Sequence, residues 1–221
     1  MTSQQPPAGD RRQAERVLRH YSRLASAYDR RWDRYSIGSL GKLVERLPLR
    51  GDERILDIAC GTGRLEGLLR QQHPSLDVTG VDLSPHMIEV ARQRLPEDSR
   101  TRWQHGTLDT VELPPAAFDV VTCNNAFHLF PAQQAAIDKM AQLVRPGGRV
   151  AIVDWCREHL QILLLQQVVR LGLGQRRQIL TREELSAMLV AAGLEMETAE
   201  RFSATPFWGM MCMIARRPAA P

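Results

Sequence analysis

The nine residues Asp57-Ile58-Ala59-Cys60-Gly61-Thr62-Gly63-Arg64-Leu65 decide the fold of this 221-residue chain. A short apolar run (Ile55, Leu56) precedes them, and leucines recur at helical spacing after them. The pattern predicts a strand, a glycine turn and a helix. Glycine lets a ligand approach the backbone closely, and the free N–H groups of a helix N-terminus can bind an anion.

A second acidic residue supports a ligand site at this turn. Asp82 stands nineteen residues after Gly63, at the end of another apolar run within Gly80-Val81-Asp82-Leu83-Ser84. This is the spacing at which nucleotide-binding folds use an acid to bind ribose hydroxyls. A tight turn without a ligand would leave Asp82 unexplained.

The two motifs together resemble those of the class I S-adenosylmethionine-dependent methyltransferases. The first motif of that family is acid-x-(Gly/Ala)-x-Gly-x-Gly, here Asp57, Ala59, Gly61 and Gly63, and the second ends in an acid, here Asp82. The resemblance covers roughly residues 20–217. It implies an α/β fold with a Rossmann-like, doubly wound, mostly parallel seven-stranded sheet and an antiparallel C-terminal strand. It also implies S-adenosyl-L-methionine as cofactor, S-adenosyl-L-homocysteine as product and no metal.

A dinucleotide-binding dehydrogenase is the nearest competing interpretation. Its Gly-x-Gly-x-x-Gly fingerprint needs a third glycine where this chain has Glu66, and Gly67 is one place out of register. Asp57 is also not part of that fingerprint. Both departures favour the sulfonium cofactor over NAD.

Composition limits the remaining classes. With 29 basic and 25 acidic residues the net charge is +4, and the basic residues are scattered, so nucleic-acid binding is not indicated. The four cysteines form no Cys-x-x-Cys pair, and we expect buried thiols in a cytoplasmic protein. The longest apolar stretch, 160–171, is shorter than the ~20 residues that span a bilayer. We therefore expect a soluble monomer or homodimer, with peripheral membrane contact left open.

The pattern along the chain predicts a flexible tail (1–12) and one domain (13–217). Within that domain we expect a helical lid at 13–47 and a helical insert at 156–180. Helix signals include Ser84-Pro85, the capping box that Thr181 and Glu184 would form, and a stop at Gly193. The expected helices are 11–30, 40–47, 64–71, one from Pro85, 132–144, 160–171 and one from Arg182. The expected strands are 54–58, 77–81, 101–105, 118–123, 149–154, 195–202 and 207–215.

The resemblance assigns cofactor contacts residue by residue. Asp57 would accept a hydrogen bond from the cofactor ammonium, and Asp82 would accept bonds from both ribose hydroxyls. The other residues expected to contact the cofactor are Ala59, Gly61, Thr62, Gly63, Leu83, Met87, Thr107, Leu108, Asn124 and Tyr28. Tyr21 and Tyr28 are candidate lid residues, although an amphipathic helix packed on the domain explains them equally well.

One segment departs from the family pattern. After the predicted strand 101–105 the family usually has Gly-Asp-Ala, whose acid meets the adenine amino group, whereas this chain has Gly106-Thr107-Leu108-Asp109. Thr107 could replace the acid, Asp109 could bend back, or backbone alone could contact the base. We favour adenine contact at Thr107 and Leu108. For Asp109, a role as a helix or turn cap is an equal alternative.

The segment after the predicted strand 118–123 supplies the catalytic candidate. Asn124 would contact the methionine moiety, and His128 could act as a general base because its unperturbed pKa lies near neutrality. The alternative for His128 is a histidine that packs or caps the loop. The segment lacks the Asn-Pro-Pro-Tyr type motif, which disfavours bases or glutamine as methyl acceptors.

The function expected is therefore methyl transfer to a small molecule, and resemblance to the quinone-biosynthesis group favours an apolar, aromatic or quinone-like one. An apolar wall for it could come from Trp155, Leu160, Leu163, Leu164, Val168, Phe207 and Trp208. A core helix or a dimer contact would give the same pattern. Two further alternatives are a lipid methyltransferase with 160–177 as an interfacial helix, and a non-catalytic cofactor-binding scaffold.

Overall fold

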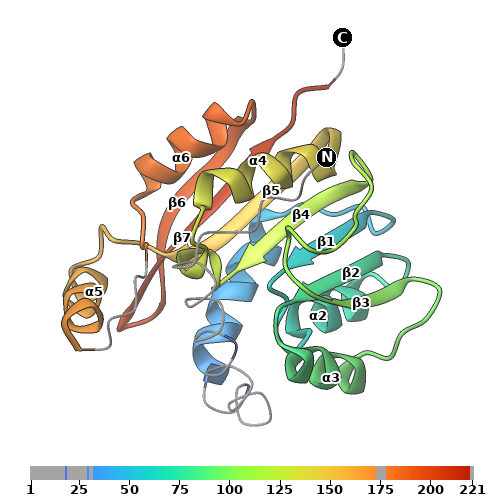
Figure 1. Ribbon diagram of the computed structural model, residues 1–221, viewed down its shortest axis with the longest axis horizontal. Coiled ribbons are helices and arrows are strands. Elements are labelled where there is room, and N and C mark those ends of the chain that lie inside the picture. Colours follow the sequence, from blue (N-terminus) through green and yellow to red (C-terminus); the bar gives the residue numbers. More distant parts are fainter. Residues whose placement is uncertain (1–17, 19–28, 30–31, 173–177, 220–221) are drawn as a thin grey trace.

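One seven-stranded sheet organises the computed structural model, which describes residues 18, 29, 32–172 and 178–219. The strand order is β3-β2-β1-β4-β5-β7-β6, and only β7 runs antiparallel to its neighbours (Figure 1). The bounds are β1 Arg54–Ile58, β2 Asp77–Asp82, β3 Thr101–His105, β4 Phe118–Asn124, β5 Val144–Trp155, β6 Glu195–Thr205 and β7 Trp208–Arg216. The predicted fold class is confirmed, and strand order reverses between β1 and β4.

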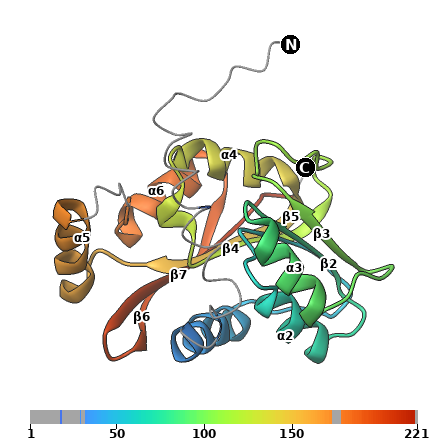
Figure 2. The same cartoon turned by 60° about the horizontal axis from the view of Figure 1, so that its bottom comes forward.

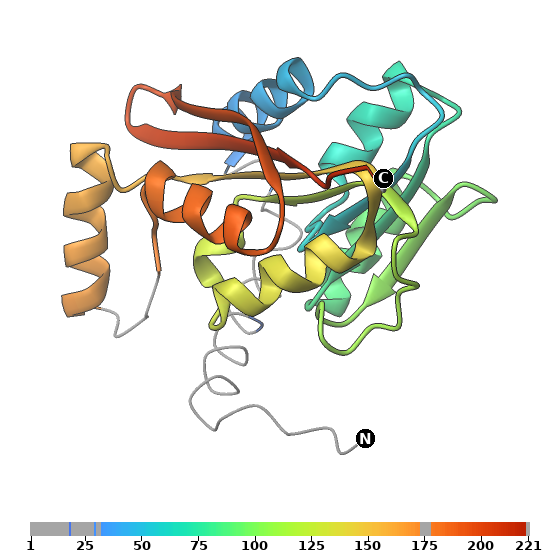
Figure 3. The same ribbon diagram turned by 90° about the horizontal axis from the view of Figure 1, so that it is seen from above.

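Helices cover both faces of this sheet. They are α2 Arg64–Gln72, α3 Pro85–Arg94, the 3-10 turn η1 Phe127–Leu129, α4 Gln133–Leu143, α5 Leu160–Gly172 and α6 Arg182–Ala191, together with an N-terminal helix over 32–46. Figures 1 and 2 place α5 at the margin of the molecule, beyond the carboxyl end of β5. Figure 3 shows α4 and α6 on one face of the sheet, with α2 and the N-terminal helix on the other. Among the described residues, no helix combines the length and apolarity that crossing a membrane requires.

The predicted helix signals act as expected. Ser84 caps α3 by accepting a hydrogen bond from the backbone N–H of Met87 at 3.4 Å, and proline occupies the first position of that helix. Thr181 and Glu184 form the capping box of α6. Gly193 adopts a φ of 79° just after that helix, a backbone conformation that favours glycine.

The N-terminal helix differs from the prediction of a separate short helix at 40–47. It is continuous over 32–46 and includes Ser36 and Ser39, which have modest helix propensity and are buried in the tertiary structure. A Cβ at Gly38 would lie 2.5 Å from the carbonyl oxygen of Ala204, so glycine allows the helix to approach β6 closely. Of the predicted helix 11–30, only residues 18 and 29 are described.

The start of β5 also corrects the sequence prediction, which placed it at 149–154. The strand begins at Val144, which pairs with Phe118 of β4 across a register shift. The Arg145-Pro146-Gly147-Gly148 stretch is held by the chain end: Gly147 N donates to the carbonyl of Arg217, and Arg217 N donates to that of Gly148. The pairing with distant segments therefore extends the strand through Pro146, Gly147 and Gly148, which by themselves would favour a turn.

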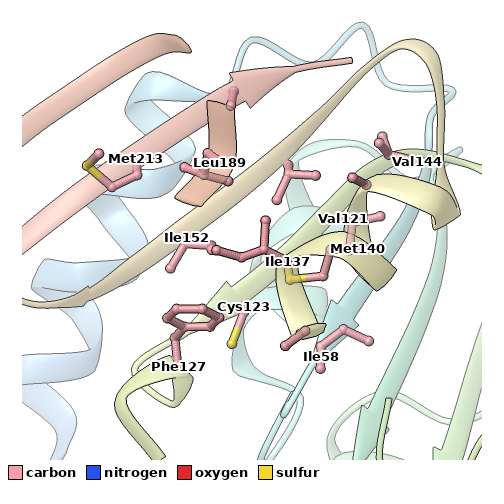
Figure 4. Packing of buried hydrophobic residues seen from close by; sticks show 14 of the residues in the cluster. Ile58, Val121, Cys123, Phe127, Ile137, Met140, Val144, Ile152, Leu189 and Met213 are labelled. Carbon is pink, nitrogen blue, oxygen red and sulfur yellow. The ribbon is translucent and has the colours of Figure 1, made fainter. Parts of the chain in front are cut away.

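The larger core lies between the sheet and α4 (Figure 4). Ile137 and Met140 of α4 are fully buried with Val121 and Ile152 of the central strands. The four cysteines are buried and form no disulfide, as predicted: Cys60, Cys123, Cys156 and Cys212. This packing fixes the strand ends that carry the candidate site.

Candidate functional site

The turn after β1 has three residues with positive φ: Ala59 at 59°, Gly61 at 56° and Gly63 at 70°. A Cβ at Gly61 would meet no atom within 4 Å, so this glycine leaves open space above the turn. A Cβ at Gly63 would lie 2.7 Å from the ring of Trp103. Gly61 therefore keeps the backbone accessible, whereas Gly63 allows the turn to pack on β3.

Asp82 at the end of β2 is fixed beside this turn. Its Oδ2 accepts a hydrogen bond from Gly61 N at 2.9 Å, and its Oδ1 accepts one from Ser84 N at 2.8 Å. Burial raises the pKa of this carboxyl. Each oxygen retains a lone pair, so the carboxylate can still accept bonds from two ligand hydroxyls.

Asp57 lies in β1 and is almost fully buried. Its Oδ1 accepts hydrogen bonds from Thr122 Oγ1 at 2.5 Å and from Asn124 Nδ2 at 3.2 Å. Burial raises the pKa of Asp57 to about 7. Asn124 Oδ1 is also buried, and it has no partner among the described residues. This pair therefore suits a ligand that carries N–H donors, such as an ammonium group.

A cavity of about 100 Å³ is lined by Asp82 and by Asn124, the hydrogen-bond partner of Asp57. Its walls are formed by Leu18, Ala59, Gly61, Asp82, Leu83, Ser84, Met87, Asn124, Asn125, Ala126 and Leu129. Ligand pockets usually measure about 300–1,000 Å³. This cavity is therefore smaller than a ligand of nucleotide size requires.

Six predicted cofactor residues line this cavity: Ala59, Gly61, Asp82, Leu83, Met87 and Asn124. Sequence reasoning missed Ser84, Asn125, Ala126 and Leu129, although they directly follow the two motif-bearing strands. Asn125 has a φ of 58° and bonds to the N-terminal helix through Tyr35 and Ser39, at 2.8 and 2.9 Å. Those long-range partners leave no local signal in the sequence.

Three other predicted cofactor residues, Thr62, Thr107 and Leu108, do not line this cavity. Thr62 is buried, and its hydroxyl donates to Asp29 at 2.7 Å. Thr107 bonds through its backbone N–H to Thr110 Oγ1 at 2.8 Å, and Leu108 belongs to the main core. Asp109 is exposed. Tyr21 and Tyr28 lie outside the described residues.

His128 is held by an acid that the sequence reasoning missed. Its Nδ1 lies 2.7 Å from Asp154 Oδ1, and its backbone N–H donates to Asp154 Oδ2 at 2.7 Å. The ring stacks on that of Trp155, with the ring centroids 4.3 Å apart and an angle of 13° between the ring planes. His128 Nε2 is buried without a partner among the described residues, and the ring does not line the cavity. One feature of the sequence could have identified Asp154: it is the acid at the carboxyl end of the predicted strand 149–154.

Four aromatic side chains gather beside His128. Trp32, Tyr35, Trp155 and Trp208 have ring centroids 5.0 to 5.9 Å apart, and we call them the aromatic group. The Tyr35 hydroxyl accepts a hydrogen bond from Trp155 Nε1 at 2.7 Å. The aromatic group therefore joins the N-terminal helix to the ends of β5 and β7.

The apolar wall predicted from α5 does not form at this cavity. Leu160, Leu163 and Leu164 are 67, 39 and 58% exposed, and Phe207 in the β6–β7 turn is 76% exposed. None of them lines the cavity. Within the described ranges, no group of three His, Cys, Asp or Glu side chains is arranged to hold a metal.

A glycine turn and two strand-end acids at the reversal point of a doubly wound sheet define a nucleotide-type cofactor-binding protein. A family model described as "Methyltransferase domain" matches residues 55–148. The ubiquinone biosynthesis O-methyltransferase of Xylella fastidiosa strain M23 is 31% identical over 186 residues, which are 80% of this chain and 74% of that protein. The chain belongs to the family of S-adenosylmethionine-dependent methyltransferases.

Other relatives agree with this assignment. The 27-O-demethylrifamycin SV methyltransferase of Amycolatopsis mediterranei is 32% identical over 76% of this chain, which spans 64% of that protein's length. An S-adenosylmethionine-dependent methyltransferase from Mesorhizobium loti shares the fold, with a TM-score of 0.69 at 21% identity over 81% of this chain and 98% of that one. So does Haemonchus contortus phosphoethanolamine N-methyltransferase 2, solved with S-adenosyl-L-methionine, with a TM-score of 0.68 at 18% identity over 81% of this chain and 52% of that one.

Proposed function

We propose that this protein transfers the methyl group of S-adenosyl-L-methionine to a hydroxyl of a small apolar or aromatic, quinone-like molecule. The observation that carries the proposal is the cavity flanked by Asp82 on one strand end and by Asn124, next to Asp57, on the others. In this proposal, the two acids would meet the ammonium and the ribose of a cationic, ribose-bearing cofactor. The family of the chain supports the same cofactor.

The residues present fit this cofactor. Asn124 Oδ1 is a buried oxygen that accepts no hydrogen bond from the part of the chain that the structure describes, and together with Asp57 it would hold the ammonium. The two oxygens of Asp82 would accept bonds from the ribose hydroxyls, while Leu83 and Met87 would pack on the adenine. We place the amino-acid part of the cofactor near Gly61, whose outer side is open.

When bound, S-adenosyl-L-methionine supplies a methyl group that the sulfonium charge already activates. The chain itself has to orient the substrate and exclude water, and orientation alone can account for several kcal/mol of the barrier. In this proposal Asp154 holds Nδ1 of His128, which leaves Nε2 to take the proton of the substrate hydroxyl. The substrate would then have to reach His128 beside the aromatic group.

The nature of the substrate rests on two observations. The aromatic group offers flat apolar surfaces near the strand ends, and such surfaces suit a planar aromatic ring. Relatives are named as methyltransferases of ubiquinone biosynthesis and of a rifamycin. The first observation favours a planar ring, and the name of the O-methyltransferase relative favours a hydroxyl over an amine as the group methylated.

Calorimetry tests the cofactor part of the proposal. The purified protein would be titrated with S-adenosyl-L-methionine, S-adenosyl-L-homocysteine and NADH. We expect micromolar binding of the first two and no heat with NADH. Absence of binding by both sulfur compounds would refute the assignment.

A substrate panel tests the transfer. Catechols and hydroquinones would be compared with their fully methylated ethers, with S-adenosyl-L-homocysteine formation as the readout. We expect turnover only with free hydroxyls. Cofactor binding without turnover on any hydroxylated ring, together with turnover on amines or carbon acids, would overturn the proposed substrate class. Binding without any turnover would favour the scaffold alternative.

A lipid-surface version of this function has one observation in its favour, the exposed leucines of α5. Replacing Leu160 and Leu164 by serine should weaken co-sedimentation with anionic liposomes, because both side chains are exposed apolar groups. Charge reversal at Arg176 and Arg177 should do the same. Val190→Ser, at an exposed apolar residue of α6, is the matched control. Unchanged co-sedimentation in both variants would exclude this version.

A further inference from the structure

Glu66 is a buried acid with no visible partner. It lies in the first turn of α2, directly behind the glycine turn, and only 1% of its surface is exposed. Neither carboxyl oxygen has a hydrogen-bond partner among the described residues. An isolated carboxylate is costly to bury, so this side chain is held in its neutral form. Consistently, burial raises the pKa of Glu66 well above its usual range.

Two further acids lie beside Glu66, and we call Asp57, Glu66 and Asp82 the acid cluster. The charges of Asp57 and Asp82 both raise the pKa of Glu66, after burial. Asp82 likewise raises that of Asp57. The nearby thiol of Cys60 has its own pKa raised by burial and by the same three acids. The acids therefore oppose one another's ionisation.

The cations around the acid cluster are few and already engaged. Arg94 of α3 acts on Glu66, but its guanidinium bonds to the carboxylate of Asp29 and to the carbonyl of Thr62. His105 of β3 acts on Asp82, and its ring nitrogen lies 3.1 Å from the carbonyl of Leu83. Within the described ranges, no cationic side chain forms an ion pair with the cluster. A cationic ligand group would therefore add a counter-charge that the described side chains do not provide through an ion pair.

Hydrogen-bond donors are unevenly shared among the three acids. Asp57 accepts bonds from Thr122 and Asn124, and Asp82 accepts two backbone N–H bonds. Glu66 accepts none. Since donors stabilise the ionised form, a proton on the acid cluster is held best at Glu66. Coupled acids share their protons, however, so a measured proton belongs to the cluster as a whole.

We propose that the acid cluster stores a proton at Glu66 in the cofactor-free protein and releases it when the cofactor ammonium binds beside Asp57 and Asn124. The location of the ammonium rests on the proposed function. A carboxyl O–H bond breaks, the proton passes to the buffer, and the cluster gains a negative charge that pairs with the ammonium. Cofactor affinity then rises with pH near neutrality. A ligand that lacks the ammonium releases no proton.

Calorimetry in phosphate and in Tris measures this proton directly, because the two buffers differ in ionisation enthalpy. S-adenosyl-L-methionine, S-adenosyl-L-homocysteine and methylthioadenosine, which lacks the amino-acid part, would be titrated at pH 6, 7 and 8. The native protein should release up to one proton with the first two ligands and none with the third. Its dissociation constant should fall by up to about tenfold per pH unit in the responsive range.

Two substitutions isolate Glu66. Glu66→Gln keeps the shape without an ionisable group, and Glu66→Met also removes the unpartnered polar atoms, so at least one should fold well. In both, proton release should fall by half or more and affinity should lose most of its pH dependence. Glu89→Gln, the same change at an exposed residue of α3, should behave as the native protein does.

Three outcomes would overturn the inference: no proton release by the native protein, equal release in Glu66→Gln, or release with methylthioadenosine. A second readout does not need a ligand. Infrared spectra of the cofactor-free protein at pH 7 should show a protonated carboxyl band that Glu66→Gln lacks, and its absence would refute proton storage. Failure of every ligand to bind, with this band present, would overturn the proposed function and leave the stored proton established.

Discussion

Replacing Asp82 by alanine removes the carboxylate that we place on the cofactor ribose. Its two oxygens already accept bonds from Gly61 N and Ser84 N at 2.9 and 2.8 Å. The substitution therefore has two effects, one on cofactor affinity and one on the turn itself. Both follow from the loss of an ionised acceptor with two oxygens.

The magnitude can be worked from these contacts. A hydrogen bond to a charged group contributes about 1.5–3 kcal/mol. Because each oxygen is shared with a backbone N–H group, we take the lower value for each ribose bond, which gives roughly 3 kcal/mol or about a 150-fold loss of affinity. The substitution also leaves the N–H groups of Gly61 and Ser84 without their acceptor, so unfolding free energy should fall by about 1–3 kcal/mol.

Calorimetry with S-adenosyl-L-homocysteine measures the affinity, and urea unfolding measures the stability. Asp82→Asn, which keeps one acceptor oxygen, should lose about tenfold in affinity. Asp138→Ala, at an exposed acid on α4, is the matched control and should change neither quantity. An unchanged affinity in a folded Asp82→Ala protein would refute the central assignment.

Three further predictions concern the turn, the buried histidine and pH. Gly63→Ala should cost about 2–4 kcal/mol of stability, because its Cβ would lie 2.7 Å from an aromatic ring at a φ of 70°; a melting temperature no lower than that of Gly67→Ala would contradict this. His128→Ala should cost about 2–4 kcal/mol of unfolding free energy, since Asp154 loses its buried partner, while cofactor affinity stays within about twofold; a large loss of affinity would place His128 in the cofactor site. The pKa of Asp57 is raised from 3.8 to about 7 by burial, so the acid cluster of the native state binds a proton that the unfolded chain has lost. This contribution to stability is full below about pH 4 and is lost as pH rises through 7. Asp57→Asn should flatten urea-measured stability between pH 4 and 7 without cofactor, and an unchanged slope would disprove the assignment.

Elements with strong local signals could be predicted from the sequence. The strand 101–105, the cap at Ser84 and the capping box at Thr181 all agree with the structure, because each depends on residues close in the chain. The early start of β5 and the continuous helix over 32–46 could not be predicted. They depend on Phe118, Arg217 and Ala204, which are distant in sequence.

Some residues of the candidate site could likewise be predicted from the sequence, and others could not. Asp57 and Asp82 stand near strand ends, and the order of a doubly wound sheet brings such ends together. The spacing to the glycine turn indicated Asp82, and the resemblance to the family motif indicated Asp57. The partners of His128 and Asn125 come from β5 and the N-terminal helix. No spacing rule connects those segments.

By itself, the sequence determined the class of fold, the glycine turn and the two acids, because backbone conformation and strand periodicity are local properties. Only the tertiary structure decided that Gly63 packs on Trp103, that Glu66 is buried beside two other acids, and that His128 lies against Asp154 and Trp155. Burial and charge coupling depend on which side chains meet across elements. Those contacts exist only in the folded chain, and they set the protonation of this site.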